Sequence, residues 1–154
     1  MLACYHEYAD ILKLWVEFKY RGIDPALQMN SSFILACKRG HFEIVKLLLG
    51  LEDRGIDVAA KSNDGFIRAC GGWFLEFVKL LLGLKDRGID PAANANHAFM
   101  VVCQEGHIEI VKLLLSLEDR GIDPAVNENR AFIVSCKRGH FEIVQLLFAL
   151  KDRG

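Results

Sequence analysis

Apolar residues recur at helical spacing in short blocks along the whole chain. Each block falls into two segments, and each segment predicts a short helix with one apolar face. In one block the apolar positions are Phe33, Ala36 and Cys37 in the first helix and Ile44, Leu47, Leu48 and Leu51 in the second. Gly40 lies between the two helices, where a glycine can take positive φ and end the first. The pattern therefore predicts pairs of antiparallel helices joined by tight turns.

The same block returns every 33 residues. Residues 53–57, Asp-Arg-Gly-Ile-Asp, come back unchanged at 86–90 and 119–123. One column of glycines and one of cysteines follow this period: Gly22, Gly55, Gly88, Gly121 and Gly154, and Cys4, Cys37, Cys70, Cys103 and Cys136. Short amphipathic helices are not stable alone, whereas stacked copies bury a continuous core. We expect one array over 1–154, made of a partial unit 1–22 and units 23–55, 56–88, 89–121 and 122–154.

Several polar residues keep their place in every unit. Asp24-Pro25 suits a tight turn in which the Asp side chain bonds the backbone ahead of it. The asparagine column, Asn30, Asn63, Asn96 and Asn129, fits the N-cap of the first helix. Glu43 fits the first turn of the second helix, where the helix dipole favours an anion. Asp53 and Arg54, with their later copies, predict an ion pair within or between units, with simple solvation as the alternative.

These residues also carry a family resemblance. Residues 36–49, Ala-Cys-Lys-Arg-Gly-His-Phe-Glu-Ile-Val-Lys-Leu-Leu-Leu, resemble the central part of an ankyrin repeat, and so do 106–115 and 139–144. Two features depart from that pattern. The Thr-Pro-Leu-His opening is replaced by residues such as Ser31-Ser32-Phe33-Ile34, and five residues separate Leu49 from Gly55 where the family has about two. The resemblance implies an all-α helix-turn-helix solenoid, and the departures predict a short finger loop with little or no β-hairpin and a lengthened second helix.

Composition narrows the classes of function. Lys and Arg total 19 against 20 Asp and Glu, so the net charge of −1 argues against non-specific nucleic-acid binding, which needs a basic surface. A hydrophobic content of 52% is too high for a disordered chain. No apolar run approaches the roughly 18–20 residues of a membrane span, and carboxylates near the N-terminus argue against a signal peptide. We expect an intracellular, cytoplasmic protein that contacts neither membrane nor nucleic acid and carries no cofactor.

The cysteine and histidine columns fall four residues apart, as in Cys37 and His41, and again in Cys103/His107 and Cys136/His140. Such a pair can indicate a thiolate–imidazole dyad or half a metal site. Here the pair follows from the period, and no third group converges on it. Equivalent positions in stacked helices lie roughly 8–10 Å apart, beyond the reach of a disulfide. We therefore predict small buried cysteines, no catalytic residue and no metal site, with a thiol enzyme as the remaining alternative.

The positions that differ between units are candidates for binding a partner. They are Met29 and Glu128 in one column, Ser31, Asp64, His97 and Arg130 in a second, and Lys38, Gln104 and Lys137 in a third. In ankyrin-like arrays the loops and first helices line the concave face, which usually binds partners. The resemblance therefore implies that these side chains share one surface.

Unit 56–88 departs most from the others. Arg68 stands where the other units have Leu35, Val101 and Val134. Gly71-Gly72-Trp73-Phe74 replaces the usual Lys-Arg-Gly-His type of turn. An exposed Trp73 and Phe74 would be natural anchors for a partner, because large rigid rings bury much area in each contact. The alternative is a rewired turn in which Gly72 takes positive φ and Trp73 packs onto the core.

Together these patterns predict a non-catalytic protein–protein interaction module that binds a protein partner through its concave loop and first-helix face. The alternative is a structural or assembly role through end-to-end stacking, because the last unit keeps its apolar stacking residues, and arrays normally need polar end units. The sequence names no partner and leaves the oligomeric state open.

Overall fold

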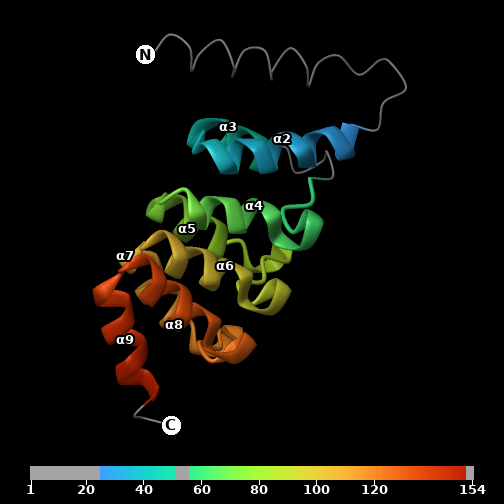
Figure 1. Cartoon of the computed structure of the whole chain (residues 1–154). Coiled ribbons are helices and arrows are strands. Elements are labelled where there is room, and N and C mark those ends of the chain that lie inside the picture. Colours follow the sequence, from blue (N-terminus) through green and yellow to red (C-terminus); the bar gives the residue numbers. More distant parts are fainter. Residues whose placement is uncertain (1–24, 51–55, 152–154) are drawn as a thin grey trace.

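The computed structural model describes residues 25–50 and 56–151, which form four two-helix units stacked one upon another (Figure 1). The helices are α2 (Pro25–Arg39), α3 (Phe42–Leu49), α4 (Ala60–Gly71), α5 (Leu75–Leu82), α6 (Ala93–Glu105), α7 (Ile108–Leu115), α8 (Val126–Arg138) and α9 (Phe141–Lys151). Two 3-10 turns, η2 (Lys85–Arg87) and η3 (Glu118–Arg120), follow α5 and α7. These ranges contain no strand, so the prediction of an all-α solenoid without a β-hairpin is confirmed there. The partial unit 1–22 lies outside the described residues.

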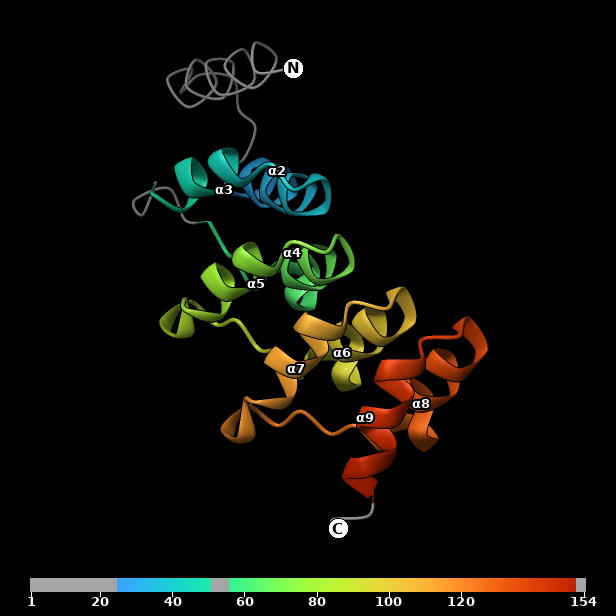
Figure 2. The ribbon, with the colours of Figure 1, turned by 90° about the vertical axis from the view of Figure 1, so that its left-hand side faces the viewer.

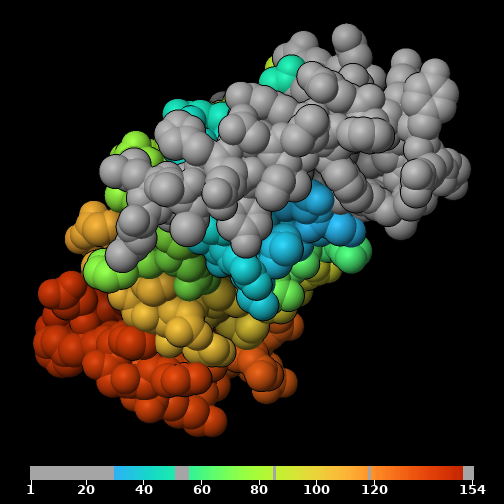
Figure 3. Space-filling view, turned by 90° about the horizontal axis from the view of Figure 1, so that it is seen from above, coloured from blue at the N-terminus to red at the C-terminus, as the bar shows by residue number. Residues whose placement is uncertain are grey.

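Neighbouring first helices, α2, α4, α6 and α8, pack closely on one another along the stack. Neighbouring second helices touch at far fewer positions. Each unit is displaced sideways from the one before it, as Figure 2 shows, and seen from above each later unit projects past its neighbour (Figure 3). The core is continuous because the same columns fill it in each unit: Phe33, Phe66 and Phe99 are almost fully buried, as are Val45, Val78 and Val111. Burying each such side chain contributes about 1.5–3 kcal/mol.

The asparagine column joins neighbouring units, so the prediction that it caps the first helix was wrong. Within the first turn of α4, Lys61, Ser62 and Asn63 take left-handed backbone angles with φ between 52° and 66° and kink the helix there. Asn63 is buried, and its Oδ1 accepts a hydrogen bond from the backbone N–H of Asp90 at 3.1 Å. The same contact recurs from Asp57 to Asn30 and from Asp123 to Asn96. Asn tolerates left-handed angles better than most residues, and here its amide oxygen reaches the next unit instead of its own helix.

The aspartates that open the three later units behave as predicted, whereas Asp24 lies outside the described residues. Oδ1 of Asp90 accepts a hydrogen bond from the backbone N–H of Ala92 at 2.9 Å, which closes a tight turn through residue 91. Asp57 and Asp123 make the same contact two residues ahead, although Val58 replaces proline after Asp57. These turns take the place of a protruding finger.

The second helix is not lengthened in units 56–88 and 89–121, contrary to the prediction. α5 ends at Leu82 and α7 at Leu115, and the extra residues form the separate turns η2 and η3. The backbone leaves helical angles at Leu84, with ψ of 51°, and again at Leu117, with ψ of 63°. Both leucines are half-buried against the core. The break in each helix therefore coincides with the packing of a leucine side chain against the core. In unit 122–154 the second helix, α9, does run on to Lys151.

The arginine column holds these turns in place. Arg87 donates to the backbone oxygens of Leu49 at 3.1 Å and Ile56 at 3.3 Å, and Arg120 donates to that of Ile89 at 2.7 Å. The predicted pairing with the adjacent aspartates, Asp86 and Asp119, was therefore wrong for these two units. The guanidinium groups instead satisfy carbonyl oxygens left unpaired by non-helical backbone. The pair Asp53 and Arg54 lies outside the described residues.

Candidate interaction surface

Two hollows lie side by side on the face of the first helices. The Arg68 hollow, of about 490 Å³, includes Lys38, Asp64, Arg68 and His97 in its lining. The Arg130 hollow, of about 600 Å³, includes His97, Glu128 and Arg130. His97 lines both, so the two form one continuous surface across α4, α6 and α8. The structure thus brings together six of the side chains that vary between units.

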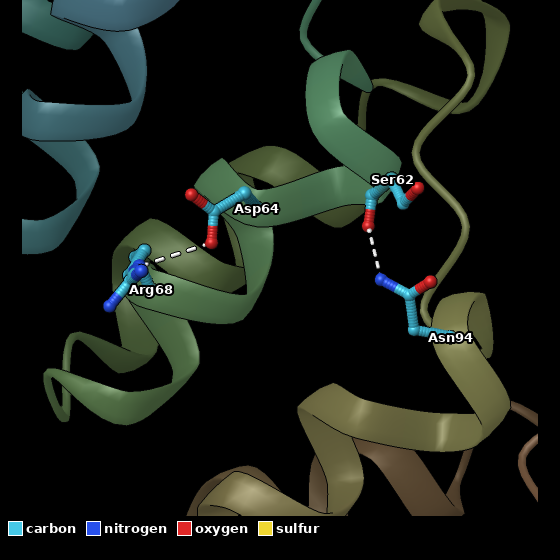
Figure 4. Close-up of polar contacts among 4 residues, drawn as sticks. All are labelled: Ser62, Asp64, Arg68 and Asn94. Carbon is cyan, nitrogen blue, oxygen red and sulfur yellow. Dashed lines mark hydrogen bonds and ion pairs between the residues drawn. The ribbon is translucent and has the colours of Figure 1, made fainter.

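Arg68 is held in position from its own helix. Its Nε donates to Oδ1 of Asp64 at 3.0 Å, one helical turn earlier, as Figure 4 shows. Both side chains remain partly exposed, at 46% for Arg68 and 28% for Asp64. The same view shows Asn94 reaching across from α6 to the backbone oxygen of Ser62 at 3.2 Å. Close to the ion pair between Arg68 and Asp64, the hydrogen bond from Asn94 to Ser62 thus connects α6 to α4.

Trp73 occupies a backbone position that the other described units fill with glycine. Its φ is 64°, close to the values of Gly40, Gly106 and Gly139 at 69°, 82° and 76°. Left-handed angles cost a bulky residue roughly 1–2 kcal/mol. The prediction that Gly72 takes the positive φ was wrong, since its φ is −87°. Trp73 is also 70% exposed, so it does not pack into the core.

The indole of Trp73 stacks on a ring from the next unit and is otherwise largely exposed. The ring of His107 stacks on it in parallel, with centroids 5.7 Å apart and an interplanar angle of 4°. Nε2 of His107 lies 3.1 Å from the backbone oxygen of Gly71, which anchors the imidazole to the turn. With 70% of the residue exposed, the rest of the indole is open to solvent.

Phe74 has a different role from Trp73. It stands in the histidine column, is only partly exposed, and its ring lies directly over Gly40 of the preceding unit. The ring of His140 lies over Gly106 in the same way. Phe74 is therefore a packing residue of the stack, although the sequence made it a candidate anchor beside Trp73.

The remaining candidates lie around these features. Ser31 and Lys137 are exposed, and the amide of Gln104 donates to Glu105 at 2.9 Å. Met29 belongs to α2, but its side chain lies outside what the structure describes. Sequence reasoning missed several lining residues, among them Lys61, Asn94, Met100 and Asn127. Lys61, Asn94 and Asn127 share one varying column, and that variation was the available signal.

Three of the four described thiols, Cys37, Cys70 and Cys103, are buried. Burial raises the pKa of Cys37 to about 12 and that of Cys103 to about 12, and it raises the pKa of Cys70 as well. Protonated thiols are poor nucleophiles and poor metal ligands. Cys136 is exposed. Within residues 25–50 and 56–151 no three His, Cys, Asp or Glu side chains come together as a metal site would need.

The fold and this surface define a helical repeat solenoid with a variable face. The chain matches the family of ankyrin repeats, with three copies over residues 66–153 and a further ankyrin repeat over residues 30–63. It therefore belongs to the ankyrin repeat family, whose members are generally protein–protein interaction modules and typically non-catalytic. No curated protein matches the sequence. None of the described helices has the length and hydrophobicity that a bilayer crossing needs.

Proposed function

We propose that this chain binds a protein partner through the first-helix face and the adjoining turn at Trp73, without catalysis of its own. The observation that carries the proposal is the strained and exposed indole. A left-handed tryptophan opposes folding, and at 70% exposure it recovers little energy by burial. Because Trp73 contributes so little to the stability of the isolated fold, its presence is best explained by contact with a binding partner.

The distribution of fixed and varying columns supports the same surface. The fixed asparagine and arginine columns join the units, and the fixed phenylalanines fill the core. Six of the side chains that vary between units line the two hollows. Because the hollows belong to packed helices, they exist before a partner arrives, and little conformational entropy is lost on binding.

The test is to capture partners from a lysate of the source organism and to measure the affinity of the captured protein for wild type and for Trp73→Gly. Glycine is the residue that the other described units carry at this position, so the backbone is retained. We expect binding to weaken at least about tenfold, because interface tryptophans often contribute 2 kcal/mol or more. Phe148→Leu serves as the control, since it removes an exposed aromatic ring from α9, two units beyond the unit of Trp73. Equal binding by all three chains would contradict the proposal.

A second candidate function is assembly through the outer face of the last unit. Phe141 and Phe148 are 69% and 57% exposed, and Cys136 and Asn129 are exposed too. Their counterparts one unit earlier are buried or half-buried: Ile108, Leu115, Cys103 and Asn96. A further unit docked there would continue the established stacking interface.

Sedimentation over a wide range of protein concentration tests this assembly role. The role predicts that the mass of the wild type rises with concentration and that Phe148→Glu abolishes the rise. A constant monomer mass would contradict it.

A further inference from the structure

We propose that the Arg68 hollow recognises an Asp or Glu side chain within an extended segment of the partner. This inference rests on the proposed binding function and adds the chemistry that the partner must supply. It also places that chemistry in unit 56–88, because the equivalent positions in the other units are the apolar residues Leu35, Val101 and Val134.

The first argument is the orientation of the guanidinium group. The hydrogen bond to Asp64 uses Nε of Arg68. The two terminal nitrogens make no hydrogen bond or ion pair with the residues that the structure describes. Figure 4 shows one of these nitrogens pointing away from Asp64. Asp64 thus orients the side chain and leaves a planar pair of donors, which matches the two oxygens of a carboxylate.

The second argument is the balance of charge. Lys38 and Lys61 line the same hollow, and both are exposed without an ion pair within the described ranges. Of the two acidic residues in the lining, Asp64 is paired with Arg68, and Glu105 accepts a hydrogen bond from Gln104. Three cationic side chains, Lys38, Lys61 and Arg68, thus face two carboxylates in the lining, and an anionic group complements the excess of positive charge.

The third argument separates a polypeptide segment from a small free anion. The Arg68 hollow also includes Ile67 and Val101 in its lining, so apolar surface adjoins the cationic groups. Leu35 lies in the same column as Arg68, on the neighbouring helix α2, and is 49% exposed. Through His97 the hollow continues into the Arg130 hollow. A segment with an acidic residue flanked by apolar side chains uses all of these features at once.

The experiment selects binders from a library of random peptides displayed on phage. The baits are wild type, Arg68→Leu and Arg138→Leu. Leucine is the residue that unit 23–55 carries at the position of Arg68, so the fold is expected to persist, and thermal unfolding checks it. Arg138 is exposed and lines neither hollow, so its variant controls for the loss of one positive charge. We expect peptides selected by wild type and Arg138→Leu to share an Asp or Glu at a fixed distance from apolar residues, and those selected by Arg68→Leu to lack it.

A synthetic peptide from the wild-type selection, together with its Glu→Gln or Asp→Asn form, then completes a double-mutant cycle. On wild type the amide form is expected to bind about tenfold more weakly, because hydrogen bonds to charged groups contribute about 1.5–3 kcal/mol. On Arg68→Leu the two forms are expected to bind within about twofold of each other. Arg68→Lys keeps the charge without the paired donors, and we expect an intermediate ratio.

The outcomes separate this inference from the proposed function. Peptides that bind wild type without an acidic residue, or an amide penalty that persists in Arg68→Leu, would overturn the acidic specificity while leaving a protein-binding surface. A library that yields no binder above background on any of the three baits would count against both.

Discussion

The turns at Trp73 and Gly106 occupy the same place in neighbouring units and follow the same path. Their φ angles are 64° and 82°. A ring from the next unit contacts each of them: His107 stacks on the indole of Trp73, and His140 lies over Gly106. Gly139 takes the same left-handed angle, with φ of 76°, although no ring lies over it, so the turn belongs to each unit and does not depend on the residue that occupies it. Glycine meets this demand without strain, so the tryptophan is tolerated by the fold and not required by it.

The largest expected effect contrasts the middle of the stack with its end. Phe66→Ala removes a ring with 0% exposure between packed units, and we expect it to lower the free energy of unfolding by about 3–5 kcal/mol. Phe132→Ala removes the equivalent, half-buried ring of the last unit and is expected to cost clearly less. Urea denaturation followed by circular dichroism measures both. Equal losses would mean that the end face is covered in solution.

The next prediction transfers the unusual turn to a regular unit. Gly106→Trp forces a bulky residue into left-handed angles and displaces the His140 ring, so we expect a destabilisation of about 1–3 kcal/mol. Gly106→Ala is the matched control, because it introduces part of the backbone strain but little side-chain volume. If Gly106→Trp left the melting temperature unchanged, the strain assigned to Trp73 would be refuted.

The asparagine contacts give a similar contrast between interior and end. Asn63→Ala leaves the N–H of Asp90 without its partner, and we expect a loss of about 1–3 kcal/mol. Asn129 is exposed in the last unit, so Asn129→Ala is expected to change stability by less than about 0.5 kcal/mol. Thermal unfolding of the two variants side by side decides whether the column acts between units or, as a cap would, equally in every unit.

The smallest effect concerns the thiols. At neutral pH we expect a thiol reagent to label Cys136 quickly and Cys103 only when the protein unfolds, because burial raises the pKa of Cys103 to about 12. The same shift predicts that stability falls as the pH rises from 9.0, the ordinary thiol value, toward about 12, since the unfolded chain loses its thiol protons first. Mass spectrometry of the labelled native protein measures the first expectation. Rapid labelling of Cys103 would contradict its burial.

The sequence predicted the features that depend on packing. The period of 33 and the apolar columns at Phe33 and Val45 follow from burial, which acts on every unit alike, and the family resemblance placed the variable face on the first helices. The role of Asn63 and of Arg87 was missed, because each bonds a backbone group that only the relative placement of units brings near. Rules that consider only neighbouring residues in the sequence favoured a helix cap for Asn63 and an ion pair with Asp86 for Arg87. The left-handed angle of Trp73 was missed because Gly72 beside it is the residue that local rules favour for that angle.

The central claim is that Trp73 serves a partner and opposes the stability of the isolated fold. The most direct measurement is the free energy of unfolding of Trp73→Gly against wild type. The account predicts a value equal to that of wild type or higher by up to about 1 kcal/mol, because relief of backbone strain offsets the loss of the His107 stack. A loss of about 2 kcal/mol or more would contradict it, and would make Trp73 part of the core of the protein.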